Sequence, residues 1–215
     1  MNARAMQFEK NCAVLRKYIP EPVVETMATW IVDLDFKLKI KKERSTKLGD
    51  YSSPQNGMNH VITINHNLNK YSFFITLVHE VAHLTTYNKF RHTVSPHGQE
   101  WKNEFKILMQ PFLVTEVFPI DVLYAIRQYI QNPAASSCTD TQLLRTLKLY
   151  DEDSGQVFLE HLPYKSVFLH NGSRVFQKGE KIRKRFRCVE ISTGTVYLFD
   201  PLTEVELFEE LANNQ

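Results

Sequence analysis

The stretch Leu77-Val78-His79-Glu80-Val81-Ala82-His83-Leu84 decides how the first half of this 215-residue chain folds. Apolar residues recur in and just before it at spacings of three and four, namely Phe74, Leu77, Val78, Val81 and Leu84. This spacing is typical of an amphipathic helix, and it predicts a helix over residues 71–87. On that helix His79 and His83 are four residues apart, so their side chains project from one face about one turn apart.

Two imidazoles at this spacing can bind one metal ion. Zinc accepts histidine nitrogens at roughly 2.0–2.1 Å, a reach that neighbouring turns of a helix allow. Glu80 directly follows the first of the two histidines, so its carboxylate can lie beside a metal-bound water and accept its proton. Zinc lowers the pKa of such a water to about 7, which creates a nucleophile near neutral pH. The His-Glu-x-x-His pattern therefore predicts one Zn²⁺ ion with Glu80 as general base.

A catalytic zinc needs a third protein ligand and one open position. Three residues downstream are candidates: His92, His97 and Glu100. His92 is more simply an exposed loop residue beside Arg91. Glu100 would project from the first turn of the next predicted helix, whereas His97 precedes Gly98 where a loop could return to the metal. The ligand preferences of zinc favour His97, with Glu100 as the alternative.

The surrounding sequence predicts an α+β fold for the region 1–131. Phe36 to Lys41 alternates apolar residues with lysines, the pattern of a half-buried strand. Residues 47–51 and 61–65 are further strand candidates, and 52–57 is a predicted turn. Helices are expected over 14–34 with a break near Pro20 and Pro22, and over 98–109 and 121–130.

The remaining chain is expected to be a linker followed by a small β-rich subdomain. Asn132-Pro133-Ala134-Ala135-Ser136-Ser137 has linker composition, and a short helix is predicted over 141–150. From Gln156 onward the signals are β-like, with a hairpin turn at Ser192-Thr193-Gly194. We therefore divide the chain into 1–131, a linker with a short helix at 132–155, and a β-rich region at 156–215.

Composition excludes several classes of protein. The 43% hydrophobic and 23% charged residues indicate a folded chain rather than a disordered one. No apolar run is long enough to span a bilayer, and the first 17 residues lack the pattern of a signal peptide, so a cytoplasmic protein without a membrane partner is expected. The cysteines Cys12, Cys138 and Cys188 form no CxxC pair, which argues against a disulfide framework or an all-cysteine zinc site.

The net charge of +2 hides two basic clusters. Residues 36–47 hold six basic residues and one acidic residue, and residues 174–187 hold seven basic residues and one acidic residue. The candidates for contact with a polyanion in the second cluster are Lys178, Lys181, Arg183, Lys184, Arg185 and Arg187, which flank Phe176 and Phe186. The candidates in the first cluster are Lys37, Lys39, Lys41, Lys42 and Arg44. Such side chains can neutralise phosphates and an exposed aromatic ring can stack on a base, although charged residues also guard solvated strand edges.

Three stretches of the chain resemble the SprT-like family of zinc metalloproteases, which includes bacterial SprT and eukaryotic Spartan. They are residues 64–68, residues 77–84 and Pro96-His97-Gly98-Gln99-Glu100-Trp101, the last of which is similar to the HGxxF/W segment of the family. The resemblance implies a zincin-like core, with His79, His83 and His97 as zinc ligands and Glu80 as general base. It covers residues 18–111 with specific motifs.

The resemblance also implies a connection with DNA, because Spartan-type members cleave proteins crosslinked to DNA. Many members carry a C-terminal zinc ribbon with paired cysteines, whereas only Cys188 of this chain lies in ribbon-like surroundings. The β-rich region is therefore expected to resemble a zinc ribbon that lacks its metal site. Any contact with DNA must then depend on basic side chains.

The sequence leaves three hypotheses about the function of the chain. The leading hypothesis is a zinc-dependent endopeptidase acting on DNA-associated proteins, with a role in the repair of DNA–protein crosslinks. The alternative is a DNA-binding or transcription-associated module whose zinc is structural. A zinc hydrolase of small substrates is a third possibility. Tyr51, Tyr87 and His92 are all candidate oxyanion partners.

Overall fold

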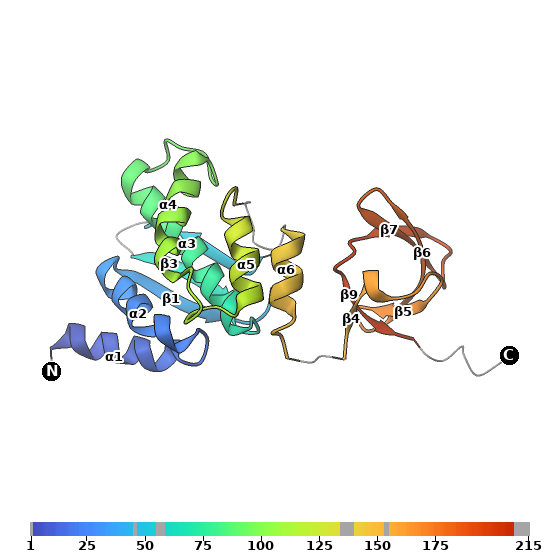
Figure 1. Cartoon of the computed structure of the whole chain (residues 1–215), viewed down its shortest axis with the longest axis horizontal. Coiled ribbons are helices and arrows are strands. Elements are labelled where there is room, and N and C mark those ends of the chain that lie inside the picture. Colours follow the sequence, from blue (N-terminus) through green and yellow to red (C-terminus); the bar gives the residue numbers. More distant parts are fainter. Residues whose placement is uncertain (1, 45–46, 55–58, 134–139, 153–154, 209–215) are drawn as a thin grey trace. The chain divides into compact units, whose positions relative to one another are not determined.

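The protein is described by a computed structural model that covers residues 2–44, 47–54, 59–133, 140–152 and 155–208. The chain divides into two compact units, residues 1–151 and residues 152–215 (Figure 1). Parts of the predicted turn 52–57 and of the predicted linker 132–137 lie outside the described residues. The architecture is α+β, as the sequence predicts.

The first unit contains six helices and three strands among its described residues. The helices are α1 (Ala3–Leu15), α2 (Val24–Asp33), α3 (Lys70–Phe90), α4 (Gln99–Met109), α5 (Ile120–Tyr129) and α6 (Thr141–Lys148), and the strands are β1 (Phe36–Lys41), β2 (Gly49–Ser52) and β3 (His60–Asn65). Short 3-10 turns lie at Glu21–Val23 and Gln110–Phe112. The sequence prediction missed most of α1, because only Cys12 and Leu15 of this helix are buried and its apolar periodicity is weak.

The three strands form one mixed sheet in the order β1-β3-β2. β1 runs parallel to β3 with Leu38 opposite Ile62, and β2 runs antiparallel to β3 with Tyr51 opposite that same Ile62. Because side chains alternate between the faces of a sheet, Tyr51 and Gly49 share a face with the buried Ile62 and Ile64. The lysines of β1 lie on the opposite face and are exposed, so the alternation predicted for this strand is confirmed.

Helix α3 lies at the centre of the first unit (Figure 1). It begins after Asn69, whose Oδ1 accepts hydrogen bonds from the backbone N–H groups of Tyr71 and Ser72 and so caps the helix. Ten consecutive residues, Phe73 to Ala82, are buried. The expected single apolar face is therefore wrong, because a helix that is covered on all sides needs apolar residues around its whole circumference.

Helix α6 belongs to the first unit and is not a free linker helix. Leu143 and Leu147 are buried in the same apolar core as α3 and α5. Asn69, the cap of α3, donates a hydrogen bond of 2.9 Å to the carbonyl of Leu147. The packing of α6 thus supports the start of the helix that carries His79 and His83.

The second unit is a six-stranded antiparallel sheet in the order β4-β9-β5-β6-β7-β8. Its strands are β4 (Val157–Phe158), β5 (Val167–His170), β6 (Arg174–Ile182), β7 (Arg185–Glu190), β8 (Val196–Phe199) and β9 (Glu204–Leu207). They curl around a small core that contains Phe168, Phe176 and Cys188 (Figure 1). The β-rich character predicted for this region is confirmed, whereas its likeness to a zinc ribbon stays a prediction.

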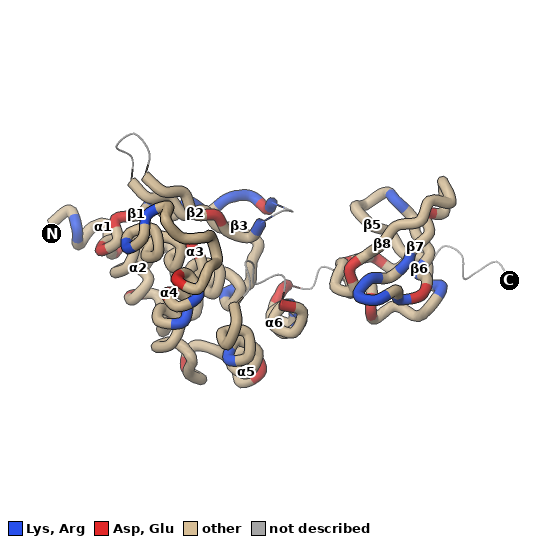
Figure 2. Tube along the Cα trace, turned by 90° about the horizontal axis from the view of Figure 1, so that it is seen from above, with Lys and Arg blue, Asp and Glu red and all other residues tan. Residues whose placement is uncertain are grey.

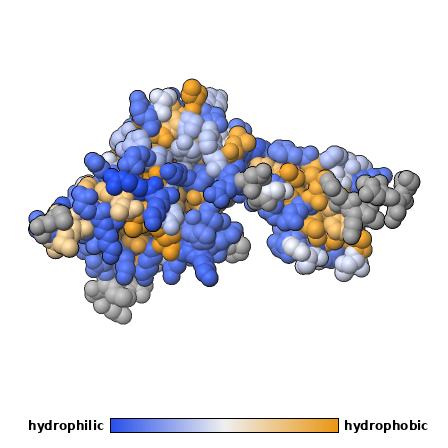
Figure 3. Space-filling view, turned by 90° about the horizontal axis from the view of Figure 1, so that it is seen from below, coloured by the Kyte–Doolittle hydropathy of each residue, from blue (hydrophilic) through white to orange (hydrophobic). Residues whose placement is uncertain are grey.

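Charge and hydropathy are unevenly distributed on the surface. Lysines and arginines gather along β1 and on the hairpin between β6 and β7 (Figure 2). Apolar side chains remain exposed on the second unit (Figure 3), including Val189, Ile191 and Leu198. Among the described residues, no helix combines the length and apolarity that crossing a bilayer requires.

Candidate metal centre

Three imidazoles converge beside the middle of α3. His79 and His83 come from neighbouring turns of α3, and His97 comes from the segment before α4. The Nε2 atom of His97 lies 2.9 Å from Nε2 of His83 and 3.2 Å from Nε2 of His79. Within the described parts of the chain, this is the group of His, Cys, Asp or Glu residues whose ligand atoms could hold one metal ion.

His97 is presented by a tight turn. The backbone N–H of Gly98 donates a 2.9 Å hydrogen bond to the carbonyl of Ser95, which closes a turn with Pro96 and His97 at its centre. The φ angle of His97 is +59°, a region that non-glycine residues seldom adopt. Such outliers persist where the surrounding structure enforces them and they cluster at functional sites. The strained turn aims the His97 imidazole at α3.

The electrostatic state of the three rings suits a metal. Burial, together with the neighbouring imidazoles, lowers the pKa of His79 to about 2 and the pKa of His83 to about 3. Burial also lowers the pKa of His97. All three rings are therefore neutral near pH 7, so each offers a nitrogen lone pair, the form that binds metals.

The spacing of the nitrogens also suits zinc. Two ligands at roughly 2.0–2.1 Å from one tetrahedral ion lie roughly 3.3–3.4 Å apart, which is close to the two shortest separations here. Three nitrogen ligands leave a fourth tetrahedral position for water or substrate. The residues present therefore fit a mononuclear site with an open position.

Trp101 of α4 packs against all three imidazoles of the site. Its ring centroid lies 4.6 Å from that of His79, 5.3 Å from that of His83 and 4.8 Å from that of His97. Trp101 is fully buried and stacks on Phe105 at 5.4 Å. This packing restricts the orientations of all three imidazoles, so Trp101 is a positioning residue.

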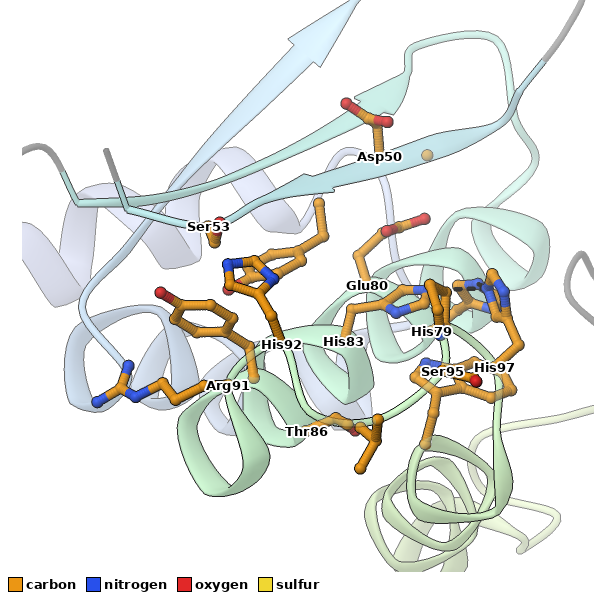
Figure 4. A pocket seen from close by; sticks show the side chains of 16 residues that line it. Asp50, Ser53, His79, Glu80, His83, Thr86, Arg91, His92, Ser95 and His97 are labelled. Carbon is orange, nitrogen blue, oxygen red and sulfur yellow. Dashed lines mark hydrogen bonds between the residues drawn. The ribbon is translucent and has the colours of Figure 1, made fainter. Parts of the chain in front are cut away.

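Glu80 lies between α3 and strand β2, pointing toward the strand that carries Asp50 (Figure 4). The residue is only 6% exposed. Burial, together with the nearby Asp50 carboxylate, raises the pKa of the Glu80 carboxyl to about 8. Strand β2 can pass this close because residue 49 is glycine, since a Cβ atom there would lie 2.6 Å from Glu80 Oε1.

A cavity of about 530 Å³ opens beside the three histidines. Most of its lining residues come from β2, α3 and the segment 91–97, and they include Tyr51, Tyr87, Arg91 and His92. The hydroxyl of Tyr51 is 2.8 Å from Nδ1 of His60, so this group already has a partner. Burial raises the pKa of Tyr51 well above its ordinary value. Tyr51 is therefore a neutral, fixed wall of the cavity.

The structure brings together the preferred residues of the predicted metal site but not the alternative ligand. His79, His83, Glu80 and His97 all line the same cavity. Glu100 does not belong to the metal-competent group and does not line the cavity. His92 is an exposed residue, as expected, but its ring lies 5.2 Å from that of Tyr87 and contributes to the cavity wall.

The prediction for the second basic cluster is wrong for two of its residues. Lys178 is only 4% exposed, and its ammonium donates hydrogen bonds to the carbonyls of Glu160 and Leu162. Phe176 is fully buried. Neither residue is available to a nucleic acid, because alternation along β6 turns both toward the core. The exposed cations of the cluster are Lys181, Arg183, Lys184, Arg185 and Arg187.

Sequence reasoning missed the contributions of Gly49 and Arg91 to the site. A glycine inside a predicted strand is a recognised signal of close backbone approach, so Gly49 could have been singled out. Arg91 carries no such signal, because its place in the cavity depends on how the segment 91–97 returns over α3.

The fold and the site together define a protein with a candidate metal centre built from three histidines beside a buried carboxylate. Residues 24–122, which include this centre, match the model of the SprT-like family. The chain therefore contains a SprT-like domain. No curated protein and no solved structure gives a significant match to the chain.

Proposed function

We propose that the chain is a zinc-dependent endopeptidase that hydrolyses peptide bonds in DNA-associated proteins. The observation that carries this proposal is the convergence of three imidazoles, with His97 within hydrogen-bond distance of both His79 and His83, next to the buried Glu80. The SprT-like match supports the same conclusion, because the motif residues lie inside the matched segment. On this proposal the first unit is a zincin-type core.

Each residue has a distinct role in the proposed reaction. His79, His83 and His97 hold the zinc ion, which supplies Lewis-acid activation of water when bound. Glu80 accepts a proton from the attacking water and can pass it to the leaving amine. The positive charges of Lys47 and Arg44 favour the ionised form of Glu80 and so oppose part of the effect of burial on its pKa. The cavity receives the substrate chain alongside β2.

Two exposed basic surfaces support an association with DNA. The hairpin between β6 and β7 carries Lys181, Arg183, Lys184, Arg185 and Arg187, which are all exposed. The exposed face of β1 carries Lys37, Lys39 and Lys41. Lysine and arginine side chains that neutralise phosphates displace counterions, so binding through them weakens steeply as salt rises.

One observation favours a second function, that of a DNA-binding module with a structural zinc. The basic hairpin belongs to the second compact unit, whereas the histidines belong to the first. Such an arrangement could bind DNA without any hydrolysis. This function predicts that DNA affinity is unaffected by Glu80→Gln and that no substrate is cleaved.

Cleavage by a zinc-loaded Glu80→Gln variant separates these functions. The substrate is a small protein crosslinked to a DNA strand, and the same protein without DNA serves as the comparison. We expect the wild-type chain to cleave the crosslinked protein and the variant to lose that activity while it keeps its zinc. Equal cleavage by both chains would refute Glu80 as the base, and absence of cleavage by the wild type would favour the binding module.

A further inference from the structure

The wall of the cavity consists of a series of rings that leads from the histidines to Arg91. The ring of Tyr51 lies 6.4 Å from that of His83 and is nearly parallel to it, at 6°. The ring of Tyr87 lies 6.3 Å from that of Tyr51, and the guanidinium carbon of Arg91 lies 5.1 Å from the centre of the Tyr87 ring. Figure 4 shows Arg91 and His97 at opposite ends of the cavity. The cavity therefore extends from the candidate metal centre to the guanidinium group of Arg91.

Among the described residues that line this cavity, Arg91 is the one lysine or arginine. In the described part of the chain, no carboxylate forms an ion pair with it. Of the two acidic residues in the lining, Asp50 is paired with Lys47 at 2.7 Å and Glu80 belongs to the metal centre. An exposed guanidinium without an acidic partner is available to an anion that enters the cavity.

The aromatic rings fix the position of this cation. The Arg91 guanidinium rests on the Tyr87 ring, an arrangement stabilised by cation–π attraction. The 2.8 Å hydrogen bond to His60 holds Tyr51, whose ring lines the same cavity. A substrate side chain that reaches Arg91 from within the cavity therefore lies beside the rings of Tyr51 and Tyr87.

We propose that Arg91, together with the rings of Tyr51 and Tyr87, forms a subsite for an acidic side chain of the protein substrate. This proposal rests on the peptidase function proposed above. An extended chain advances about 3.3 Å per residue, so the ring-to-ring steps place the subsite no more than about five residues from the bond attacked. A single arginine inside the cavity is suited to one carboxylate, whereas a DNA backbone is held by several cations along a surface.

Peptide cleavage by the zinc-loaded full-length chain tests the subsite. One peptide is made with Glu, Gln or Lys at each of the five positions on either side of the scissile bond. We expect kcat/KM to favour Glu over Gln at one position by about two- to fivefold, the strength of an exposed ion pair. Arg91→Gln should abolish that preference, and Arg91→Lys should keep part of it. Gln is unbranched at Cβ like Arg, so it meets the positive φ of residue 91 equally well.

Lys70→Gln is the matched control, because Lys70 is an exposed cation at the start of α3, the helix that ends just before Arg91, and does not line the cavity. This variant should keep the preference for Glu. The subsite is refuted if the wild type does not distinguish Glu from Gln at any position, or if Arg91→Gln still does. It is also refuted if a short DNA strand removes the preference by competing at Arg91, since phosphate would then be the occupant.

Binding separates failure of the subsite from failure of the peptidase function. The zinc-loaded Glu80→Gln chain should bind the Glu peptide more tightly than the Gln peptide, and the added Arg91→Gln change should remove the difference. If this binding pattern is found but no peptide is cleaved by the wild type, the peptidase function fails and the subsite stands. Cleavage without any difference in binding overturns the subsite alone.

Discussion

A Cβ atom at Gly49 would lie 2.6 Å from Oε1 of Glu80, so β2 passes over the candidate general base with no space for a side chain. The same atom would lie 2.6 Å from Cγ2 of Thr76. The strand and the central helix are thus in contact at the residue on which the proposed chemistry depends. Any side chain at position 49 must move the Glu80 carboxylate, the strand or both.

Gly49→Ala should lower peptidase turnover while the three histidines still bind zinc, because the clash displaces Glu80 and not the imidazoles. Overpacking of this kind costs about 1–3 kcal/mol of unfolding free energy. Turnover, zinc content and denaturant unfolding measured together test the prediction. Adding Thr76→Ser removes the clashing methyl group but leaves the clash with Glu80, so the double variant should regain part of the lost stability but not turnover. Recovery of both would place the Glu80 contact in doubt.

Trp101→Ala should destabilise the chain by about 3–5 kcal/mol, since it removes a fully buried ring from beneath the three imidazoles. Zinc affinity should fall as well, because the rings lose the packing that orients them. Unfolding of the metal-free chain isolates the packing contribution, and a zinc titration measures the loss of affinity. Unchanged zinc affinity in a folded Trp101→Ala chain would show that the indole does not position the ligands.

Removal of the metal should lower the stability of the first unit. A ligand that binds only the folded state at 1,000 times its Kd stabilises it by about 4 kcal/mol. A chelator should therefore lower the unfolding temperature of the wild-type chain, and added zinc should restore it. His83→Ala should make the unfolding temperature insensitive to the chelator. A chelator effect of equal size in that variant would point to a metal bound elsewhere.

The basic hairpin and Lys178 should respond differently to substitution. Replacing Lys181, Arg183 and Lys184 by glutamine should weaken DNA binding and reduce its salt dependence by roughly two to three units of slope, with little effect on folding. Lys178→Met should destabilise the second unit instead, because two carbonyls lose a charged donor, each such bond being worth about 1.5–3 kcal/mol. Salt-dependent DNA titrations and urea unfolding distinguish the two effects. Loss of DNA binding in a fully folded Lys178→Met chain would contradict the buried position of this lysine.

Local patterns predicted the elements that carry the metal centre. The alternation in residues 36–41 predicted β1, and the spacing of apolar residues around His79 predicted α3. The motif around His97 predicted the third imidazole, which the structure brings to within 3.2 Å of the other two. The two elements could be predicted because each depends on neighbouring residues in the chain, whereas the place of His97 was implied by the ligand preferences of zinc and by the resemblance to the SprT-like family.

Features that depend on distant contacts could not be predicted in this way. The charge of Lys178 suggested an exposed side chain, but its direction follows from the pairing of β6 with β7 and from the bulge between Lys178 and Lys181. The approach of Gly49 to Glu80 depends on how β2 pairs with β3 and packs on α3. The place of Arg91 in the cavity depends on the path of the segment that presents His97.

Zinc stoichiometry of three purified chains tests the three-histidine centre most directly. Metal content is measured for the wild type, for His97→Ala and for Glu100→Ala, each checked for folding by circular dichroism. We predict one zinc ion per wild-type chain, loss of that ion in His97→Ala and its retention in Glu100→Ala. Retention of zinc by His97→Ala together with its loss from Glu100→Ala would contradict the centre described here.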